Sequence, residues 1–196
     1  MNDRSRWDKV YGSGRVEELP WFSTSLDEDI CAALSKLGPP FGSLLSLGEG
    51  PGTQAILMAK LGWKVTATDV SEVAVRKART RAAREGVDVK FIVDNVVSTG
   101  LTGSFRVVVD RGCFHTLEPL DREAYVKNVS LLLEQGGSLL LKTFSGEERM
   151  PGPYRFSPEE IRGIFVPPFT LVETKATFFR ETAGGDRKAL FCAMRK

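Results

Sequence analysis

The sequence predicts an α/β fold: a doubly wound, mostly parallel sheet of seven strands that ends in an antiparallel C-terminal β-hairpin. Short apolar strands alternate with amphipathic helices along the chain, the pattern of a parallel sheet covered on both faces. Val107-Val108-Val109 is β-branched throughout, as expected of a strand buried on both faces. Two strand-like stretches joined by a turn come last and predict the hairpin.

Strands and helices alternate regularly in the first half of the chain. Strands are expected over 43–47, 64–69 and 89–93, and helices over 26–37, 53–61 and 71–85. Gly38-Pro39-Pro40 ends the first helix, while Ser71 and Gly86 mark the two ends of the third. This half therefore predicts three strands with helices between them.

The second half continues the alternation and then changes to a hairpin. The fourth strand centres on 107–109, a helix runs from Asp121 to Gly136-Gly137, and the fifth strand spans 138–144. Ser157-Pro158-Glu159-Glu160 has a cap residue, a first-turn proline and a glutamate at the third position, so another helix begins there. Strands over 170–179 and 189–194, joined by a turn at Ala183-Gly184-Gly185-Asp186, form the expected hairpin.

Composition limits the classes of protein that fit. The 196 residues are 42% hydrophobic and 27% charged, as in a globular protein, and a single domain over 1–196 is expected. A net charge of +2 is too weak to indicate nucleic acid as a partner. Three scattered cysteines indicate neither a disulfide framework nor a metal site. Without a signal-like or membrane-spanning apolar run, we expect a cytoplasmic monomer or weak dimer with no membrane partner.

A glycine turn follows the first strand and opens the next helix. Glycines at 48, 50 and 52 let the backbone bend sharply and approach a ligand, although an ordinary strand-to-helix turn has the same composition. The G-x-G-x-x-G spacing of dinucleotide enzymes is absent, because Thr53 occupies the last required position. Asp69 ends the second strand, where a carboxylate can accept hydrogen bonds from ribose hydroxyls or cap a helix. The combined spacing favours nucleoside binding.

Asp94-Asn95 closes the third strand, at the same carboxyl edge of the sheet. Ligands of open α/β sheets bind at this edge, so Asp94 is a candidate acceptor for an adenine amino group. Asp-Asn is also common in turns, and both interpretations remain open here.

With these motifs the sequence resembles the class I S-adenosylmethionine-dependent methyltransferases over nearly its whole length. The glycine turn looks like their first motif, 66–71 like their ribose-binding strand, and Asp94-Asn95 like their adenine-proximal pair. The resemblance implies a Rossmann-like methyltransferase fold that binds S-adenosyl-L-methionine through Trp7, Gly48, Glu49, Gly50, Gly52, Asp69, Val70, Asp94, Asn95 and Asp110. Ser46 stands where many members carry an acidic residue that contacts the methionyl amino group, and Glu49 is close to it in sequence.

A closer resemblance is to the thiopurine S-methyltransferase superfamily, which includes halide, thiol and tellurite-resistance-type enzymes. Residues 7–11 with Pro20-Trp21 look like its N-terminal lid (1–25), 109–112 like the end of its fourth strand, 119–125 like the next helix and 151–157 like its acceptor loop. It implies a small acceptor, a thiol or another soft nucleophile. Asp110-Arg111-Gly112-Cys113 also lacks the Asn/Asp-Pro-Pro-aromatic motif of enzymes that methylate base amino groups.

Methyl transfer to a soft nucleophile needs alignment more than proton removal. His115 is the candidate base, with a backbone-bonded histidine as the alternative, and Arg111 is a candidate for orienting an anionic acceptor or the methionyl carboxylate. Trp21, Tyr154 and Phe156 are expected at the acceptor, unless the aromatic residues serve mainly to pack the N-terminal segment. Two rival functions stay open: an NAD(P)-dependent oxidoreductase and a non-catalytic S-adenosylmethionine-binding protein.

Overall fold

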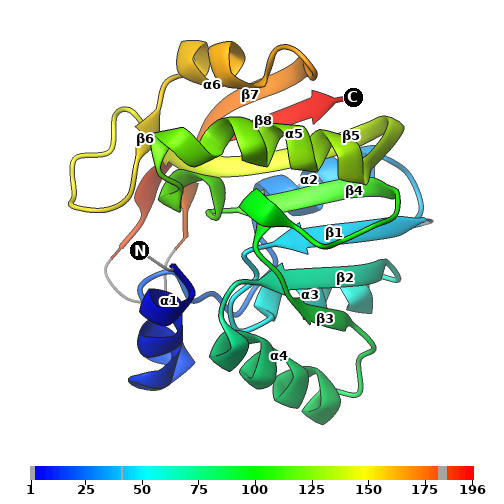
Figure 1. The fold of residues 1–196 in the computed structure, drawn as a ribbon, viewed down its shortest axis with the longest axis vertical. Helices are drawn as coiled ribbons and strands as arrows, with labels where there is room; N and C mark the ends of the chain where they lie inside the picture. The colour runs from blue at the N-terminus through cyan, green and yellow to red at the C-terminus, as the bar shows by residue number, and fades with distance from the viewer. Residues whose placement is uncertain (1–2, 41, 181–184) are drawn as a thin grey trace.

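The computed structural model describes residues 3–40, 42–180 and 185–196. Their strands form one eight-stranded sheet (Figure 1). The strand order is β3-β2-β1-β4-β5-β8-β7, with β6 paired to β5 off this path. The strands are β1 (Ser43–Leu47), β2 (Lys64–Asp69), β3 (Lys90–Val93), β4 (Phe105–Arg111), β5 (Leu133–Ser145), β6 (Arg155–Phe156), β7 (Thr170–Phe179) and β8 (Arg187–Arg195). β1 to β6 pair in parallel, whereas β8 pairs antiparallel with β5 and β7.

This topology confirms the predicted parallel sheet with its C-terminal hairpin and adds the two-residue strand β6. Ala183 and Gly184, part of the predicted hairpin turn, lie outside the described residues.

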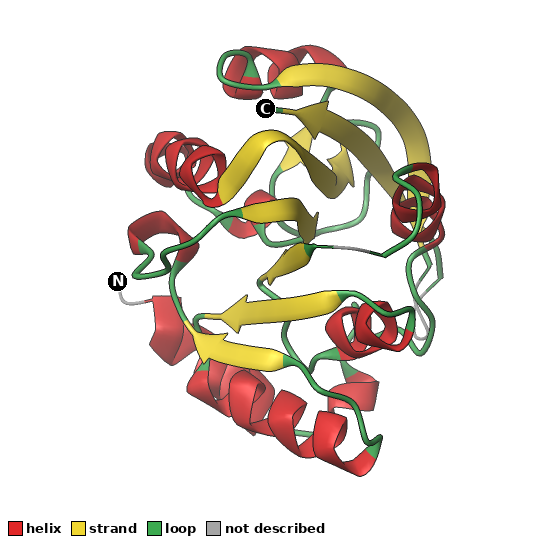
Figure 2. Ribbon diagram, turned by 90° about the vertical axis from the view of Figure 1, so that its right-hand side faces the viewer, coloured by secondary structure: helices red, strands yellow, loops and turns green. Residues whose placement is uncertain are grey.

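Helices cover both faces of the sheet (Figure 2). One face carries α2 (Glu28–Lys36), α3 (Thr53–Lys60) and α4 (Glu72–Arg84), and the other carries α5 (Arg122–Leu132) and α6 (Pro158–Phe165). Along β4, Val107 and Val109 pack in the core beneath α2, α3 and α4, while Val108 packs in the core beneath α5 and α6. Two-sided burial therefore explains the uninterrupted β-branched run.

Helix boundaries agree with the predicted caps in two places. The Ser71 side chain accepts a hydrogen bond from the amide of Ala74 at the start of α4. Ser157 and Glu160 form the expected capping box at the start of α6. Short 3₁₀ turns connect the other elements: η1 (Val16–Glu18), η2 (Val96–Ser98), η3 (Phe114–Thr116) and η4 (Pro119–Asp121). Within the described ranges, no helix is long and apolar enough to cross a membrane.

The boundary expected at Gly136-Gly137 was wrong, because α5 ends at Leu132 and β5 begins at once. The Gly136 amide donates to the Lys196 carbonyl (3.1 Å), and the Lys196 amide donates to the Gly137 carbonyl (3.1 Å). A Cβ on Gly137 would lie 2.9 Å from the Glu134 carbonyl oxygen and 3.1 Å from that of Arg106. The glycines are therefore strand residues at a close backbone approach and not a helix end.

α1 (Asp3–Gly12) lies against α4 and forms hydrogen bonds at the start of α4 and along it. The Asp8 carboxylate accepts from the Ser71 hydroxyl (2.6 Å) and the Val73 amide (3.2 Å), and Lys77 donates to the Tyr11 carbonyl (2.6 Å). α1 is thereby placed beside the carboxyl ends of β1 and β2.

Candidate active site

The carboxyl ends of β1, β2 and β3 meet at one point of the sheet edge. The two Asp69 carboxylate oxygens accept from the amides of Gly50 (2.8 Å) and Ser71 (2.8 Å). The Asp94 amide donates to the Asp69 carbonyl (3.1 Å). The structure therefore brings together the glycine turn and the two strand-end carboxylates that the sequence singled out.

A cavity of about 280 Å³ opens along this edge. Nine of the predicted site residues line it: Trp7, Trp21, Gly48, Asp69, Val70, Asp94, Asn95, Arg111 and His115. Apolar side chains of Val96 and Leu117 line it together with Val70. Asp69 is buried and Asp94 half-buried. Carboxylates beside apolar walls suit a nucleoside, because its ribose is polar and its base is flat and apolar.

Gly50 and Gly52 allow neighbouring side chains to pack closely against the turn. Gly50 has φ +59°, and a Cβ there would lie 2.6 Å from the Tyr11 hydroxyl, so a side chain would displace this buried ring. Gly52 packs against Ala78 of α4. Trp7, Tyr11 and Trp21 form an aromatic cluster with ring centroids 5.9 to 6.4 Å apart, and all three line the cavity. Tyr11 belongs to the 7–11 segment that the sequence predicts over the site.

Glu49 lies behind the turn, in a second cavity of about 50 Å³ that shares Tyr11, Trp21, Gly48 and Arg111 with the first. Its carboxylate accepts from the Ser46 hydroxyl and from the Ala55 amide (2.9 Å) at the start of α3. Burial raises the pKa of Glu49 to about 7, although these hydrogen bonds oppose the shift. A carboxylate therefore lies beside Ser46, held by the Ser46 hydroxyl, although position 46 itself is not acidic.

We expect the Glu49→Gln variant to gain stability relative to the native chain as the pH rises. The raised pKa means that the folded state binds the Glu49 proton more tightly than the unfolded chain, so the native chain loses stability from the unfolded pKa up to about 7. Urea unfolding at about pH 5 and about pH 8 should show the difference between the two proteins changing by roughly 2–3 kcal/mol. A constant difference would contradict the burial of an ionisable group at this position.

Asp94 and Asn95 serve their own loop as well as the cavity. Asp94 accepts from the Thr99 hydroxyl (2.7 Å) and the Gly100 amide (2.9 Å), and the Asn95 side chain accepts from the Val97 amide (3.0 Å). The turn interpretation is therefore realised. Both residues also line the cavity. Because a carboxylate oxygen accepts more than one hydrogen bond, the contacts of Asp94 within its loop leave it able to accept one from adenine.

Asp110, expected among the cofactor-binding residues, instead supports the turn after β4. Its buried carboxylate accepts from the amides of Cys113 (2.8 Å) and Phe114 (3.0 Å) and from the Tyr125 hydroxyl (2.7 Å). Burial raises its pKa to about 6 against these bonds. The side chain fixes the segment that carries Arg111 and His115.

His115 is a buried residue of the cavity wall, stacked on Phe144 at 4.5 Å and 5°. Its Nδ1 accepts from the Phe144 amide (3.1 Å), so the proton of the neutral ring is on Nε2. Burial, followed by the charges of Arg111 and Arg187, lowers its pKa to about 3. A ring with Nδ1 occupied and Nε2 protonated can donate a hydrogen bond but cannot accept a proton, which does not fit the base role expected for His115.

The wall around His115 contains residues that the sequence analysis missed. Phe144 at the end of β5, Phe179 at the end of β7 and Arg187 at the start of β8 line this part, with the 151–153 loop over it. The position of Phe144 at the carboxyl end of a parallel strand could have indicated its role. The hairpin residues gave no signal, because only the strand order brings them here.

Two aromatic residues predicted to meet the acceptor point elsewhere. The Tyr154 hydroxyl donates to Glu118 (2.6 Å) at the exposed surface. Phe156 is buried in the core against Phe114, with ring centroids 5.1 Å apart. The pairing of β6 with β5 turns Phe156 inward, so the 151–157 segment meets the cavity through its first three residues.

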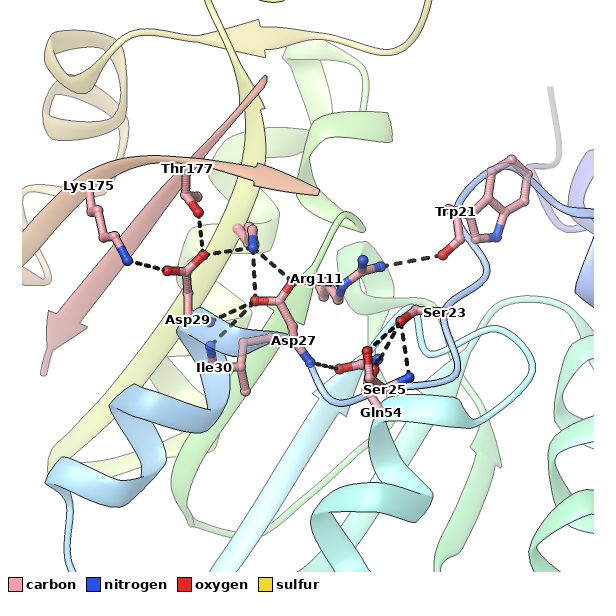
Figure 3. A network of polar contacts seen from close by, with 11 residues as sticks. Trp21, Ser23, Ser25, Asp27, Asp29, Ile30, Gln54, Arg111, Lys175 and Thr177 are labelled. Carbon is pink, nitrogen blue, oxygen red and sulfur yellow. Dashed lines mark hydrogen bonds and ion pairs between the residues drawn. The ribbon is translucent and has the colours of Figure 1, made fainter. Parts of the chain in front are cut away.

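Arg111 belongs to a buried ionic network beside the cavity (Figure 3). Its Nε donates to Asp27 (3.0 Å), which also accepts from Lys142 (2.8 and 2.9 Å). Lys142 donates to Asp29 (2.7 Å) as well, and Asp29 accepts further bonds from Lys175 and Thr177. Burial alone would raise the pKa of Asp29, but these bonds lower it to about 2. The network joins α2 to β5 and β7 and fixes Arg111 in the cavity wall.

Comparison with known proteins agrees with this geometry. Residues 44–137 match the methyltransferase domain family. An uncharacterised methyltransferase of Schizosaccharomyces pombe is 33% identical over 113 residues, which are 57% of this chain and 78% of the relative. The chain belongs to the class I S-adenosylmethionine-dependent methyltransferases. It is therefore a methyltransferase with S-adenosylmethionine as its cofactor.

Two further proteins are similar over nearly the full length of this chain. A probable thiol methyltransferase of Arabidopsis thaliana is 25% identical over 193 residues, covering 96% of this chain and 83% of the relative. The structure of the 1,6-didemethyltoxoflavin-N1-methyltransferase of Burkholderia thailandensis, with bound S-adenosylhomocysteine, superposes with a TM-score of 0.78 at 22% identity, covering 100% of this chain and 87% of that one. The latter shows that the fold is shared.

Proposed function

We propose that this methyltransferase acts on a small molecule, with a thiol or another soft nucleophile as the acceptor. The observation that carries the proposal is one cavity that runs from Asp69 and Asp94 to the aromatic wall of His115 and Phe144. Similarity to a probable thiol methyltransferase over 96% of the chain supports the acceptor class.

The residues of the strand edge suit the adenosyl part of the cofactor. Asp69 would accept hydrogen bonds from the ribose hydroxyls, and Val70 and Val96 would enclose the base beside Asp94 and Asn95. Glu49, in the adjoining small cavity, would take the methionyl amino group in place of the acid absent at position 46. Trp7, Tyr11 and Trp21 would close the site as the N-terminal lid of residues 1–25.

The chain's own contribution to the reaction is alignment and exclusion of water. When bound, S-adenosylmethionine supplies a methyl group on a positively charged sulfur. The buried wall of His115, Phe144 and Phe179 would hold the acceptor in line with this methyl, while His115 Nε2 donates a hydrogen bond to it. A soft nucleophile reacts as its anion, so no side chain has to remove a proton during transfer.

A thermal-shift measurement tests the cofactor choice against the rival oxidoreductase. S-adenosylhomocysteine should raise the melting temperature, because a ligand at a hundredfold excess over its Kd stabilises the folded state by about 2.7 kcal/mol, worth several degrees in a chain of this size. NAD and NADP should leave it unchanged. A shift with either dinucleotide and none with S-adenosylhomocysteine would overturn the proposal.

The non-catalytic alternative needs a separate measurement. Incubation with S-adenosylmethionine and a panel of thiols, followed by mass spectrometry, should give methyl thioethers. Saturable cofactor binding without a methylated product from any small nucleophile would favour a sensor over an enzyme.

A further inference from the structure

The charges along the cavity are segregated by strand. Among the described residues that line it, the carboxylates are Asp69 and Asp94, at the ends of β2 and β3. The cations are Arg111 at the end of β4 and Arg187 at the start of β8. In the strand order β3-β2-β1-β4-β5-β8-β7, these pairs lie on opposite sides of β1 and its glycine turn. The cations therefore lie at the acceptor end of the cavity, the part lined by His115, Phe144 and Phe179.

The two guanidinium groups hold the rings of the acceptor wall between them. Arg187 lies over the Phe144 ring at 4.8 Å, and Arg111 lies over the Phe179 ring at 5.0 Å. Their side chains are each 11% exposed, so their charges act through little water. His115, between them, is neutral and can add only a hydrogen-bond donor.

In the described chain, Arg111 has no carboxylate of its own to neutralise it. Asp27 faces both Arg111 and Lys142, while Asp29 faces Lys142 and Lys175, so three cations share two carboxylates (Figure 3). Nη1 of Arg111 donates to the Trp21 carbonyl (3.4 Å), and its Nη2 makes no hydrogen bond within the part of the chain that the structure describes.

Glu148, the counterion of Arg187 at 3.5 Å, is shared with backbone donors. It accepts from the amides of Arg149 (2.8 Å), Met150 (2.7 Å) and Lys188 (2.6 Å). Glu148 therefore balances the charge of Arg187, and an anion at the acceptor end would balance the excess positive charge around Arg111.

We propose, on the basis of the proposed function, that this end of the cavity is an anion site formed by Arg111, Arg187 and the Nε2–H of His115, and that it binds the acceptor in its ionised form. The guanidinium groups stabilise the nucleophilic anion. They disfavour an amine, because a protonated amine is repelled by them and a neutral amine is not attracted as an anion is. In transfer, a lone pair of the acceptor anion forms the bond to the methyl carbon while the sulfur–carbon bond breaks. Its electron pair stays on sulfur, which becomes neutral, and no proton remains to be moved.

The test uses probes whose ionisation is visible. The full-length protein is saturated with S-adenosylhomocysteine, and 4-nitrophenol or 4-nitrothiophenol is added, because their anions are yellow. The bound probes should ionise at a pH at least one unit below that of the free probes, a tenfold effect on the ionisation constant. Comparison of the phenol with the thiol, and competition by benzoate and iodide, distinguishes an oxygen, sulfur, carboxylate or halide acceptor.

Matched variants assign the effect to the two arginines. Arg111→Gln and Arg187→Gln should each lose most of the shift while binding S-adenosylhomocysteine as before. Arg162→Gln, which removes an exposed arginine of α6, should keep it. A large loss of S-adenosylhomocysteine affinity in Arg111→Gln would assign Arg111 to the methionyl carboxylate and overturn its part here.

Three results would overturn the anion site. They are an unchanged or raised ionisation pH in the native complex, no binding of any of the four anions to a complex that holds S-adenosylhomocysteine, and methylation of 4-nitrobenzylamine as fast as of 4-nitrothiophenol. Failure of S-adenosylhomocysteine to bind at all would be a failure of the proposed function instead, so the two are distinguishable.

Discussion

Replacing Asp69 by alanine should weaken S-adenosylhomocysteine binding roughly a hundredfold or more. The variant loses the acceptor for the ribose hydroxyls, and hydrogen bonds to a charged group contribute about 1.5–3 kcal/mol each. It also frees the Gly50 amide, which donates to Asp69 at 2.8 Å and orders the glycine turn. Isothermal titration calorimetry gives the change in Kd directly.

Two companion variants make the Asp69 result specific. Asp69→Asn keeps the shape and one acceptor oxygen, so its affinity should fall between those of the native chain and Asp69→Ala. Asp88→Ala removes an exposed carboxylate beyond α4 and should bind normally. If folded Asp69→Ala bound within about threefold of the native Kd, the ribose assignment would be lost.

Replacing Lys142 by methionine should cause a large loss of stability. Lys142 is 2% exposed and sits between Asp27 and Asp29, whose side chains are 3% and 4% exposed. Methionine fills a similar volume but leaves these buried carboxylates without their shared cation, a change that typically costs about 3–5 kcal/mol. Urea unfolding measures the difference.

A surface ion pair provides the matched control for Lys142. Lys36 lies 2.9 Å from Glu173 with exposures of 66% and 36%, so Lys36→Met should cost no more than about 1 kcal/mol. Adding Asp27→Asn to Lys142→Met should recover part of the loss, because in the single variant Asp27 is a buried carboxylate whose one remaining counterion is Arg111. Equal effects of Lys142→Met and Lys36→Met would show that the network contributes little.

The sequence was informative wherever local chemistry decides the structure. The glycine turn, Ser71, Asp69 and the 157–160 box act within a few residues of themselves, and their elements form as expected. The end of α5 was misjudged because Gly136-Gly137 matches a helix stop in sequence. Only the pairing with Lys196 and the approach of Arg106 show that it is strand.

The acceptor end could not be predicted, because its residues meet only through the sheet order. Phe179 and Arg187 come from the hairpin, and Phe156 turns inward through a two-residue strand whose pairing no local pattern specifies. The network had one visible sign, a lysine at 142 inside the apolar run 139–144. A buried lysine requires an acidic partner, but the sequence around position 142 does not indicate which aspartate lies near it.

The segregated charges of the cavity also bear on turnover. An acceptor with a single negative charge becomes neutral once it is methylated. Its electrostatic attraction to Arg111 and Arg187 is then lost. The spent donor has likewise lost its sulfonium charge. With such an acceptor, a wall that attracts the substrate but not its neutral methylated product would favour release of that product after transfer.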